Sequence, residues 1–259
     1  MPVADFSLDG KVAIVTGGSR GIGRSIAIGL AEAGASVAIA ARKPESLEEA
    51  VAAATAAAQG HGSEVIGVET NVRRVEELQN LVDETKKQLG RVDILINNAA
   101  TNPVFGPVEN IDERAWDTIM NTNVKACFFL SKMAREVMVE QGDGGSIVNV
   151  SSTGGVRASD VLGGYSISKA ALIMMTQVCA KNWGKDGIRV NAIAPGLIKT
   201  DFSKALWENP DILKSATSGV ALTRIGEPDE MAGAAVYFAS EASSFVTGQT
   251  MVLDGGGIL

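Results

Sequence analysis

The sequence predicts an α/β fold in which a doubly wound parallel sheet of about seven strands is flanked by helices. Two observations lead to this prediction. Short apolar runs alternate with longer segments whose apolar residues recur every three or four positions, as in right-handed βαβ units. Glycine-rich or polar segments follow several of these runs directly, at the carboxyl ends of the strands, where such sheets bind ligands.

Each strand is expected where an apolar run is bounded by a turn or by polar residues. The predicted strands are 11–16, 36–41, 64–69, 92–96, 145–150, 188–194 and 249–253. No composition break and no internal repeat divides the 259 residues, so we expect a single domain over 1–259.

The helices are expected between the strands. The first begins after Gly23 and ends at Gly34. The others are 44–59, 73–89, 114–140, the segment around Tyr165 and Lys169, and 228–240. Asn123 lies inside helix 114–140, where asparagine is disfavoured, so it is expected to mark a kink or a functional position. Residues 197–222 are polar, with little periodicity beyond 202–207, and we expect them to form a mobile lid.

The first strand runs into a glycine-rich turn with the pattern TGxxxGxG. Glycines allow a tight turn and let a phosphate approach backbone N–H groups at the start of the following helix. The turn therefore predicts a nucleotide site. The residues expected to bind the cofactor here are Gly17, Ser19, Arg20, Gly21, Ile22 and Gly23.

The second strand ends at Ala41 and is followed by Arg42 and Lys43, with no carboxylate. In dinucleotide-binding folds this position reaches the adenosine ribose, where an acidic residue binds a free 2′-hydroxyl and a basic residue accommodates a 2′-phosphate. Arg42, with Arg20 in the glycine turn, therefore favours NADP(H) over NAD(H). The alternative is that Arg42 and Lys43 simply end the strand in solvent.

Tyr165 and Lys169 lie four residues apart in a helical segment and should share one face. The apolar stripe of this helix is expected to be buried and to lie opposite both side chains; its members are Ile167, Ala170, Ala171, Met174, Met175, Val178 and Cys179. Tyrosine has a pKa near ~10, and a neighbouring ammonium favours the phenolate. The pair thus predicts a proton-transfer site, although two amphipathic residues on a solvated face would give the same short pattern.

Together these motifs resemble the short-chain dehydrogenase/reductase family over essentially the whole chain. The matching motifs are Thr16-Gly17-x3-Gly21-x-Gly23, Asn97-Asn98-Ala99, Asn123, Ser152, Tyr165-x3-Lys169 and Pro195-Gly196-x3-Thr200. The resemblance implies a Rossmann-type fold with Tyr165 as general acid/base and Ser152 holding the substrate oxygen. It also implies that Lys169 contacts the nicotinamide ribose and lowers the pKa of Tyr165, and that Asn123 orders a proton-relay water.

The same resemblance places further residues at the cofactor: Asn71, Val72, Asn98, Ala99, Tyr165, Lys169, Pro195, Gly196, Ile198 and Thr200. Two positions depart from the family pattern, since Ala100 replaces a frequent Gly and Asn71 a common Asp. Segment 194–207 looks most like NADP-dependent carbonyl and retinal reductases. Family members usually form tetramers through the long helices after the fourth and fifth strands, so a homotetramer is expected.

The expected function is hydride transfer between NADP(H) and a small-molecule carbonyl or secondary alcohol. One alternative is a 3-oxoacyl-thioester (acyl carrier protein) reductase, and one from another class is a non-catalytic NADP-binding redox sensor. A fairly hydrophobic substrate is expected, because several apolar residues could line its pocket: Val104, Phe105, Val156, Leu162, Leu197, Phe202, Leu206 and Trp207.

The composition excludes other classes of function. A net charge of −7 argues against nucleic acid or an anionic membrane as a general partner. The single histidine, His61, leaves little for a histidine-based metal site, and no metal is expected. Cys127 and Cys179 lie in apolar helical patterns and are expected to be core thiols. Neither an apolar leader nor a peroxisomal terminal signal is recognised, so a cytoplasmic location is expected.

Overall fold

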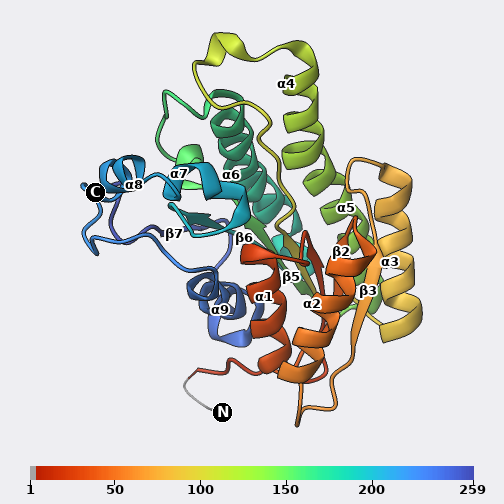
Figure 1. Ribbon diagram of the computed structural model, residues 1–259. Coiled ribbons are helices and arrows are strands. Elements are labelled where there is room, and N and C mark those ends of the chain that lie inside the picture. Colours follow the sequence, from red (N-terminus) through yellow and green to blue (C-terminus); the bar gives the residue numbers. More distant parts are fainter. Residues whose placement is uncertain (1–3) are drawn as a thin grey trace.

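The computed structural model describes residues 4–259. The first three residues, which belong to the N-terminal segment in which no leader is expected, lie outside the described residues. One parallel sheet, with the strand order β3-β2-β1-β4-β5-β6-β7, forms the middle layer (Figure 1). Its strands are β1 (Val12–Thr16), β2 (Ser36–Ala41), β3 (Val65–Glu69), β4 (Ile94–Asn97), β5 (Gly145–Val150), β6 (Ile188–Pro195) and β7 (Thr250–Leu253). The predicted fold class is confirmed.

Helices cover both faces of this sheet. They are α1 (Gly21–Glu32), α2 (Pro44–Ala57), α3 (Val75–Leu89), α4 (Glu113–Met120), α5 (Ala126–Gln141), α6 (Gly163–Trp183), α7 (Lys204–Trp207), α8 (Pro210–Thr217) and α9 (Ala232–Ala239). Helices α1, α2 and α9 pack in one core, and α3, α5 and α6 pack in the other. Neighbouring strand residues alternate between the cores: Ala13 and Val15 face the first, and Ile14 faces the second.

The predicted helix 114–140 is divided. Helix α4 ends at Met120, and the π-helical turn Asn121–Lys125 precedes α5. Single π turns inside α-helices occur frequently at functional sites. The kink expected at Asn123 is therefore confirmed as a π turn.

The expected irregular lid, 197–222, contains two helices that the sequence reading did not separate. Asn209 begins α8 as its N-cap, since its side-chain oxygen accepts hydrogen bonds from the N–H groups of Asp211 (2.9 Å) and Ile212 (3.3 Å). Pro210 follows at the first helical position, which suits proline. This Asn-Pro signal marks a helix start in the sequence and was missed.

The expected orientation of α6 is wrong. Tyr165 and Lys169 are buried, with 9% and 2% of their surface exposed, whereas Ile167, Met174 and Val178 are 44%, 58% and 51% exposed. The inner face carries polar residues whose groups are paired across the core. Asn149 on β5, for example, donates to the hydroxyl of Thr176 at 2.8 Å. A buried hydrogen-bonded residue does not contribute to an apolar stripe, so the periodicity marked the outer face.

The loop after β5 forms the 3₁₀ turn Thr153–Gly155 and packs directly on α6. A Cβ added at Gly155 would lie 2.6 Å from the carbonyl carbon of Lys169, which no real contact allows. Only glycine lets this loop approach the helix closely enough to place Ser152 beside Tyr165.

Gly155→Ala should lower the free energy of unfolding by ~1–3 kcal/mol, because the new methyl group forces the loop away from α6. Urea unfolding of the two proteins measures this difference. Gly184→Ala is the matched control, since a Cβ there meets nothing within 4 Å and the backbone φ is −58°. Equal losses in both variants would contradict the close approach.

Candidate active site

The carboxyl ends of β1 and β4 lie side by side, where the strand order reverses direction. The hydroxyl of Thr16 accepts hydrogen bonds from the N–H groups of Asn98 (3.0 Å) and Ala99 (3.1 Å). The Asn98 amide donates to the carbonyls of Thr16 (2.9 Å) and Gly17 (3.1 Å). These bonds hold the glycine turn against the end of β4, at the switch point where doubly wound sheets bind dinucleotides.

The glycine turn has the geometry of a phosphate cradle. Gly17 and Gly21 have φ values of +63° and +52°, and a Cβ at Gly23 would lie 2.3 Å from the Asn98 amide nitrogen. Arg20 is the N-cap of α1, and its side chain makes no capping hydrogen bond to the first N–H groups of that helix. The turn therefore fits a dinucleotide diphosphate, which uncapped N–H groups at a helix start bind well.

The residues expected around the adenosine lie at the ends of the neighbouring strands. Arg42 is exposed directly after β2. The N–H of Asn71, after β3, donates to Glu77 at 2.6 Å, and its side-chain oxygen accepts a long hydrogen bond from the Arg73 N–H at 3.3 Å. Val72 packs on the second core. The sheet thus brings Arg42 and Asn71 to the same edge as the glycine turn.

The segment after β6 closes over the glycine turn. Thr200 lies next to Gly21: a Cβ added at Gly21 would lie 3.1 Å from the methyl group of Thr200. Ile198 is buried and pairs with Gly226, while Gly196 packs against Asp254. Proline and glycine end β6 here, so the chain turns back across the edge of the sheet.

Ser152, Tyr165 and Lys169 meet at the carboxyl end of β5. Ser152 lies close enough to Tyr165 to lower the pKa of the phenol. The Lys169 ammonium donates to the carbonyl of Val150 at 2.6 Å and lies 5.5 Å from the centre of the Tyr165 ring. Phe202 of the lid segment covers the phenol, with the two ring centres 5.9 Å apart. The expected constellation is therefore a compact buried group under the lid segment.

Asn123 braces this group from the π turn. Its side-chain oxygen accepts from the N–H of Thr101 (2.9 Å), and its amide donates to the carbonyl of Thr101 (3.0 Å) and the hydroxyl of Ser168 (3.0 Å). Ser168, which the sequence reading missed, donates to the carbonyl of Tyr165 at 2.7 Å. Both amide hydrogens of Asn123 are engaged, so any relay water at this residue must bind to an oxygen atom.

Comparison with known proteins agrees with this geometry. A family model described as enoyl-(acyl carrier protein) reductase matches residues 17–257. Dehydrogenase/reductase SDR family member 4 of Bos taurus is 41% identical over 251 residues, which cover 97% of this chain and 88% of that protein. The human protein of the same name is 39% identical over 249 residues, with 96% and 88% covered.

The chain belongs to the short-chain dehydrogenase/reductase family. A short-chain dehydrogenase/reductase from Mycobacterium marinum superposes with a TM-score of 0.91 at 33% identity, with 98% of each chain covered. A structure from Beutenbergia cavernae gives 0.90 at 32% identity, covers 98% of this chain and 99% of that one, and holds bound NADP at low occupancy. Family membership thus covers the whole fold, the expected site included.

The electrostatics of this short-chain dehydrogenase/reductase differ from the expectation in one respect. Burial raises the pKa of Tyr165 to about 12, and the nearby Ser152 hydroxyl acts in the opposite direction. Burial also lowers the pKa of Lys169 to about 8. The Lys169 ammonium lies 5.5 Å from the centre of the Tyr165 ring, and burial outweighs the expected lowering of the pKa of Tyr165 in the chain itself.

The apolar residues expected to line one substrate pocket are divided between regions. Phe202 lies on Tyr165, whereas Trp207 lines a cavity of about 720 Å³ to which Ser152, Tyr165 and Lys169 do not contribute. Leu197 lines a second cavity of about 310 Å³. Phe105, Val156 and Phe202 are each roughly half exposed. Trp207 and Leu197 thus line two cavities that the other six residues do not line, and one shared substrate pocket stays a prediction.

The remaining expectations concern metals, membranes and thiols. Cys127 and Cys179 are free and buried, as expected. Within the described part of the chain, no cluster of three or more His, Cys, Asp or Glu residues is arranged to hold a metal ion. None of the helices in 4–259 combines the length and the hydropathy that crossing a bilayer requires.

The phenol of Tyr165 should stay protonated in the cofactor-free protein far above neutral pH. With a pKa of about 12, it should contribute no phenolate absorbance below about pH 10, where free tyrosine is half ionised. An ultraviolet titration of the wild type minus that of Tyr165→Phe measures this residue alone. A midpoint near ~7 would contradict the dominance of burial.

Proposed function

We propose that this short-chain dehydrogenase/reductase is an NADP(H)-dependent oxidoreductase that interconverts a carbonyl compound and a secondary alcohol. The observation that supports this proposal is the meeting of Ser152, Tyr165 and Lys169 beside the glycine turn. A non-catalytic redox sensor would need the dinucleotide cradle but no buried proton donor next to it. The geometry therefore favours an enzyme over the sensor.

A bound NADPH would supply the hydride that reduces the carbonyl carbon. The protein's own groups act on the oxygen. Ser152 donates a hydrogen bond to the substrate carbonyl and so polarises it, and Tyr165 transfers its phenolic proton as negative charge develops there. The raised pKa of Tyr165 keeps this proton in place until the substrate oxygen becomes basic.

Lys169 has two roles in this proposal. Its ammonium fixes α6 to the Val150 carbonyl and keeps Tyr165 in register with Ser152. Its other N–H groups are free to bind the ribose hydroxyls of the cofactor. The cation would also stabilise the phenolate that remains after proton transfer. Asn123 holds Thr101 and Ser168 on the opposite side and limits the movement of the helix.

Tyr165→Phe should retain NADPH binding and lose turnover by ~10²–10⁴-fold, the contribution typical of general acid–base catalysis. NADPH oxidation with a panel of apolar ketones and aldehydes measures turnover, and fluorescence titration measures binding. Tyr237→Phe, outside the site, is the control. A fully active Tyr165→Phe variant would refute the assignment, and wild-type protein inactive on every carbonyl would support the sensor.

A 3-oxoacyl-thioester reductase is the second candidate, because the matching family model carries an acyl carrier protein reductase description. The exposed apolar side chains of Phe105, Val156 and Phe202 around the site favour a simple hydrophobic carbonyl instead. Comparing kcat/KM for an acetoacetyl thioester with that for an aromatic ketone separates the two candidates.

The preference for NADP(H) rests on Arg42 and Arg20, with no carboxylate at the end of β2. Arg42→Ala should raise the Kd for NADPH by about tenfold or more and leave that for NADH unchanged, because only the 2′-phosphate offers a charged partner. Lys43→Ala is the matched control at the neighbouring exposed position. An equal loss for both cofactors would assign Arg42 a structural role.

A homotetramer is also proposed. Ile167, Met174 and Val178 form an exposed apolar row along α6, and Phe128 on α5 is 42% exposed. Such a patch marks an interface more often than a solvent face. Sedimentation velocity should show tetramers for the wild type and smaller species for Met174→Glu, with Lys185→Glu as a surface control. A monomeric wild type would contradict this part of the proposal.

A further inference from the structure

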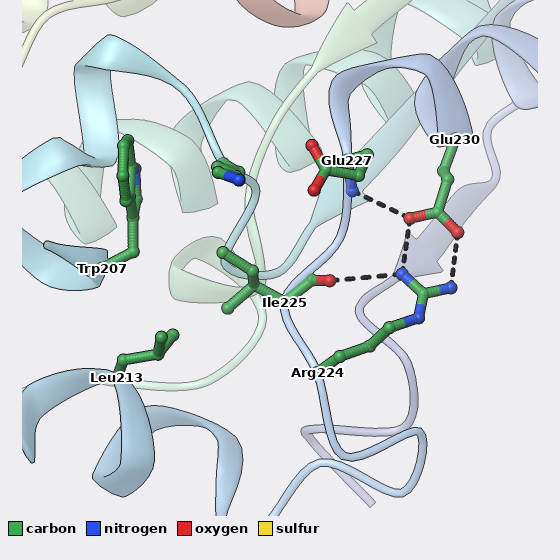
Figure 2. A pocket seen from close by; sticks show the side chains of 7 residues that line it. Trp207, Leu213, Arg224, Ile225, Glu227 and Glu230 are labelled. Carbon is green, nitrogen blue, oxygen red and sulfur yellow. Dashed lines mark hydrogen bonds and ion pairs between the residues drawn. The ribbon is translucent and has the colours of Figure 1, made fainter. Parts of the chain in front are cut away.

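We propose that the cavity of about 720 Å³ beside the lid is an accessory site for an apolar organic anion. It lies between α7, α8 and the loop before α9, and neither Ser152, Tyr165 nor Lys169 lines it. Its size is that of a small-molecule site. Figure 2 shows Trp207 and Leu213 on one side and the charged groups of Arg224, Glu227 and Glu230 on the other.

The charged wall is neutralised in part: Arg224 pairs with Glu230, whereas no cation of residues 4–259 lies within ion-pair distance of Glu227. Arg224 binds both carboxylate oxygens of Glu230, each at 2.7 Å, and also donates to the carbonyl of Ile225 at 3.2 Å (Figure 2). Glu227 and Glu230 cap each other's backbone N–H groups. These bonds make the wall rigid and leave neither Arg224 nor Glu230 as the main charge offered to a ligand.

Lys199 is the one basic residue lining this cavity that forms no ion pair with residues 4–259. Its ammonium lies 5.7 Å from the centre of the Trp207 ring. A cation on an aromatic face, in a cavity that Leu213 and Ile225 also line, suits a ligand with one anionic group at Lys199 and an apolar body.

The backbone before the charged wall is strained. Thr223 has φ +55°, and it is the one non-glycine residue with positive φ among residues 4–259. Such a conformation costs free energy and recurs at ligand clamps. Here it directs the chain so that the next residue, Arg224, reaches Glu230.

The cavity is connected to the lid. The indole N–H of Trp207 donates to the carbonyl of Thr200 at 3.0 Å, and the N–H of Lys199 donates to the carbonyl of Gly226 at 2.9 Å. Thr200 contacts Gly21, and Phe202 lies on Tyr165. A ligand that fixes Trp207 therefore restrains the segment that covers the catalytic side chains, which makes the accessory site a regulatory one.

Calorimetric titration of the full-length protein with 1-naphthylacetate tests the site, and 2-(1-naphthyl)ethanol serves as the neutral ligand of the same shape. The acid should bind about tenfold or more tightly than the alcohol, the effect of one charge-assisted hydrogen bond. Lys199→Met should remove this difference and Lys199→Arg should keep it. Lys204→Met, on α7 but outside the cavity, should match the wild type.

Binding should persist with NADPH in excess and should be lost in Leu213→Glu, which places a carboxylate in the cavity wall. Hydrogen exchange of residues 201–217 should slow when 1-naphthylacetate binds. No saturable binding, binding displaced by NADPH, or equal binding to the wild type and Lys199→Met would each overturn the site. Unchanged exchange in 201–217 would overturn its coupling to the lid. None of these readouts requires turnover, so they are independent of the proposed oxidoreductase function.

Discussion

The hydrogen bond from the buried Lys169 ammonium to the Val150 carbonyl is the interaction on which the site depends. It joins α6 to the last residue of β5, so the helix that carries Tyr165 and the strand that delivers Ser152 share one fixed point. A buried ammonium with few partners is costly, and burial lowers its pKa to about 8. The protein nevertheless buries the Lys169 ammonium next to the phenol of Tyr165, where a cation is chemically useful.

The surroundings of Lys169 show how the fold supports it. The hydroxyl of Ser151 donates to the backbone carbonyl of Lys169 at 3.0 Å, and Gly155 packs on the same peptide. From the other side, Asn123 reaches α6 through Ser168. Two separate segments, the end of β5 with its following loop and the π turn, thus position one turn of α6.

Much of this arrangement could be predicted from the sequence, and the failures have physical causes. Strand ends and glycine turns are local signals, so the sheet, the cradle and the Ser152–Tyr165–Lys169 group were within reach. Which face of α6 is buried could not be predicted, because the periodicity shows where apolar residues lie but not what covers them. Lys169 is buried by tertiary contacts that no local pattern reports. The cavity that Trp207 lines could not be predicted for the same reason, since the direction of its side chain depends on the hydrogen bond to Thr200.

The π turn at Asn121–Lys125 has a consequence for the outer surface of the protein. A π turn amounts to one residue more than a regular α-helix needs, and each helical residue rotates the chain by about 100°. The faces of α4 and α5 are therefore out of phase with the register that a continuous helix would impose. Deleting one residue to straighten the rod would turn Phe128 away from its exposed position while breaking the hydrogen bonds between Asn123 and Thr101. The hydrogen bonding of Asn123 and the direction of Phe128 thus depend on a single helical irregularity.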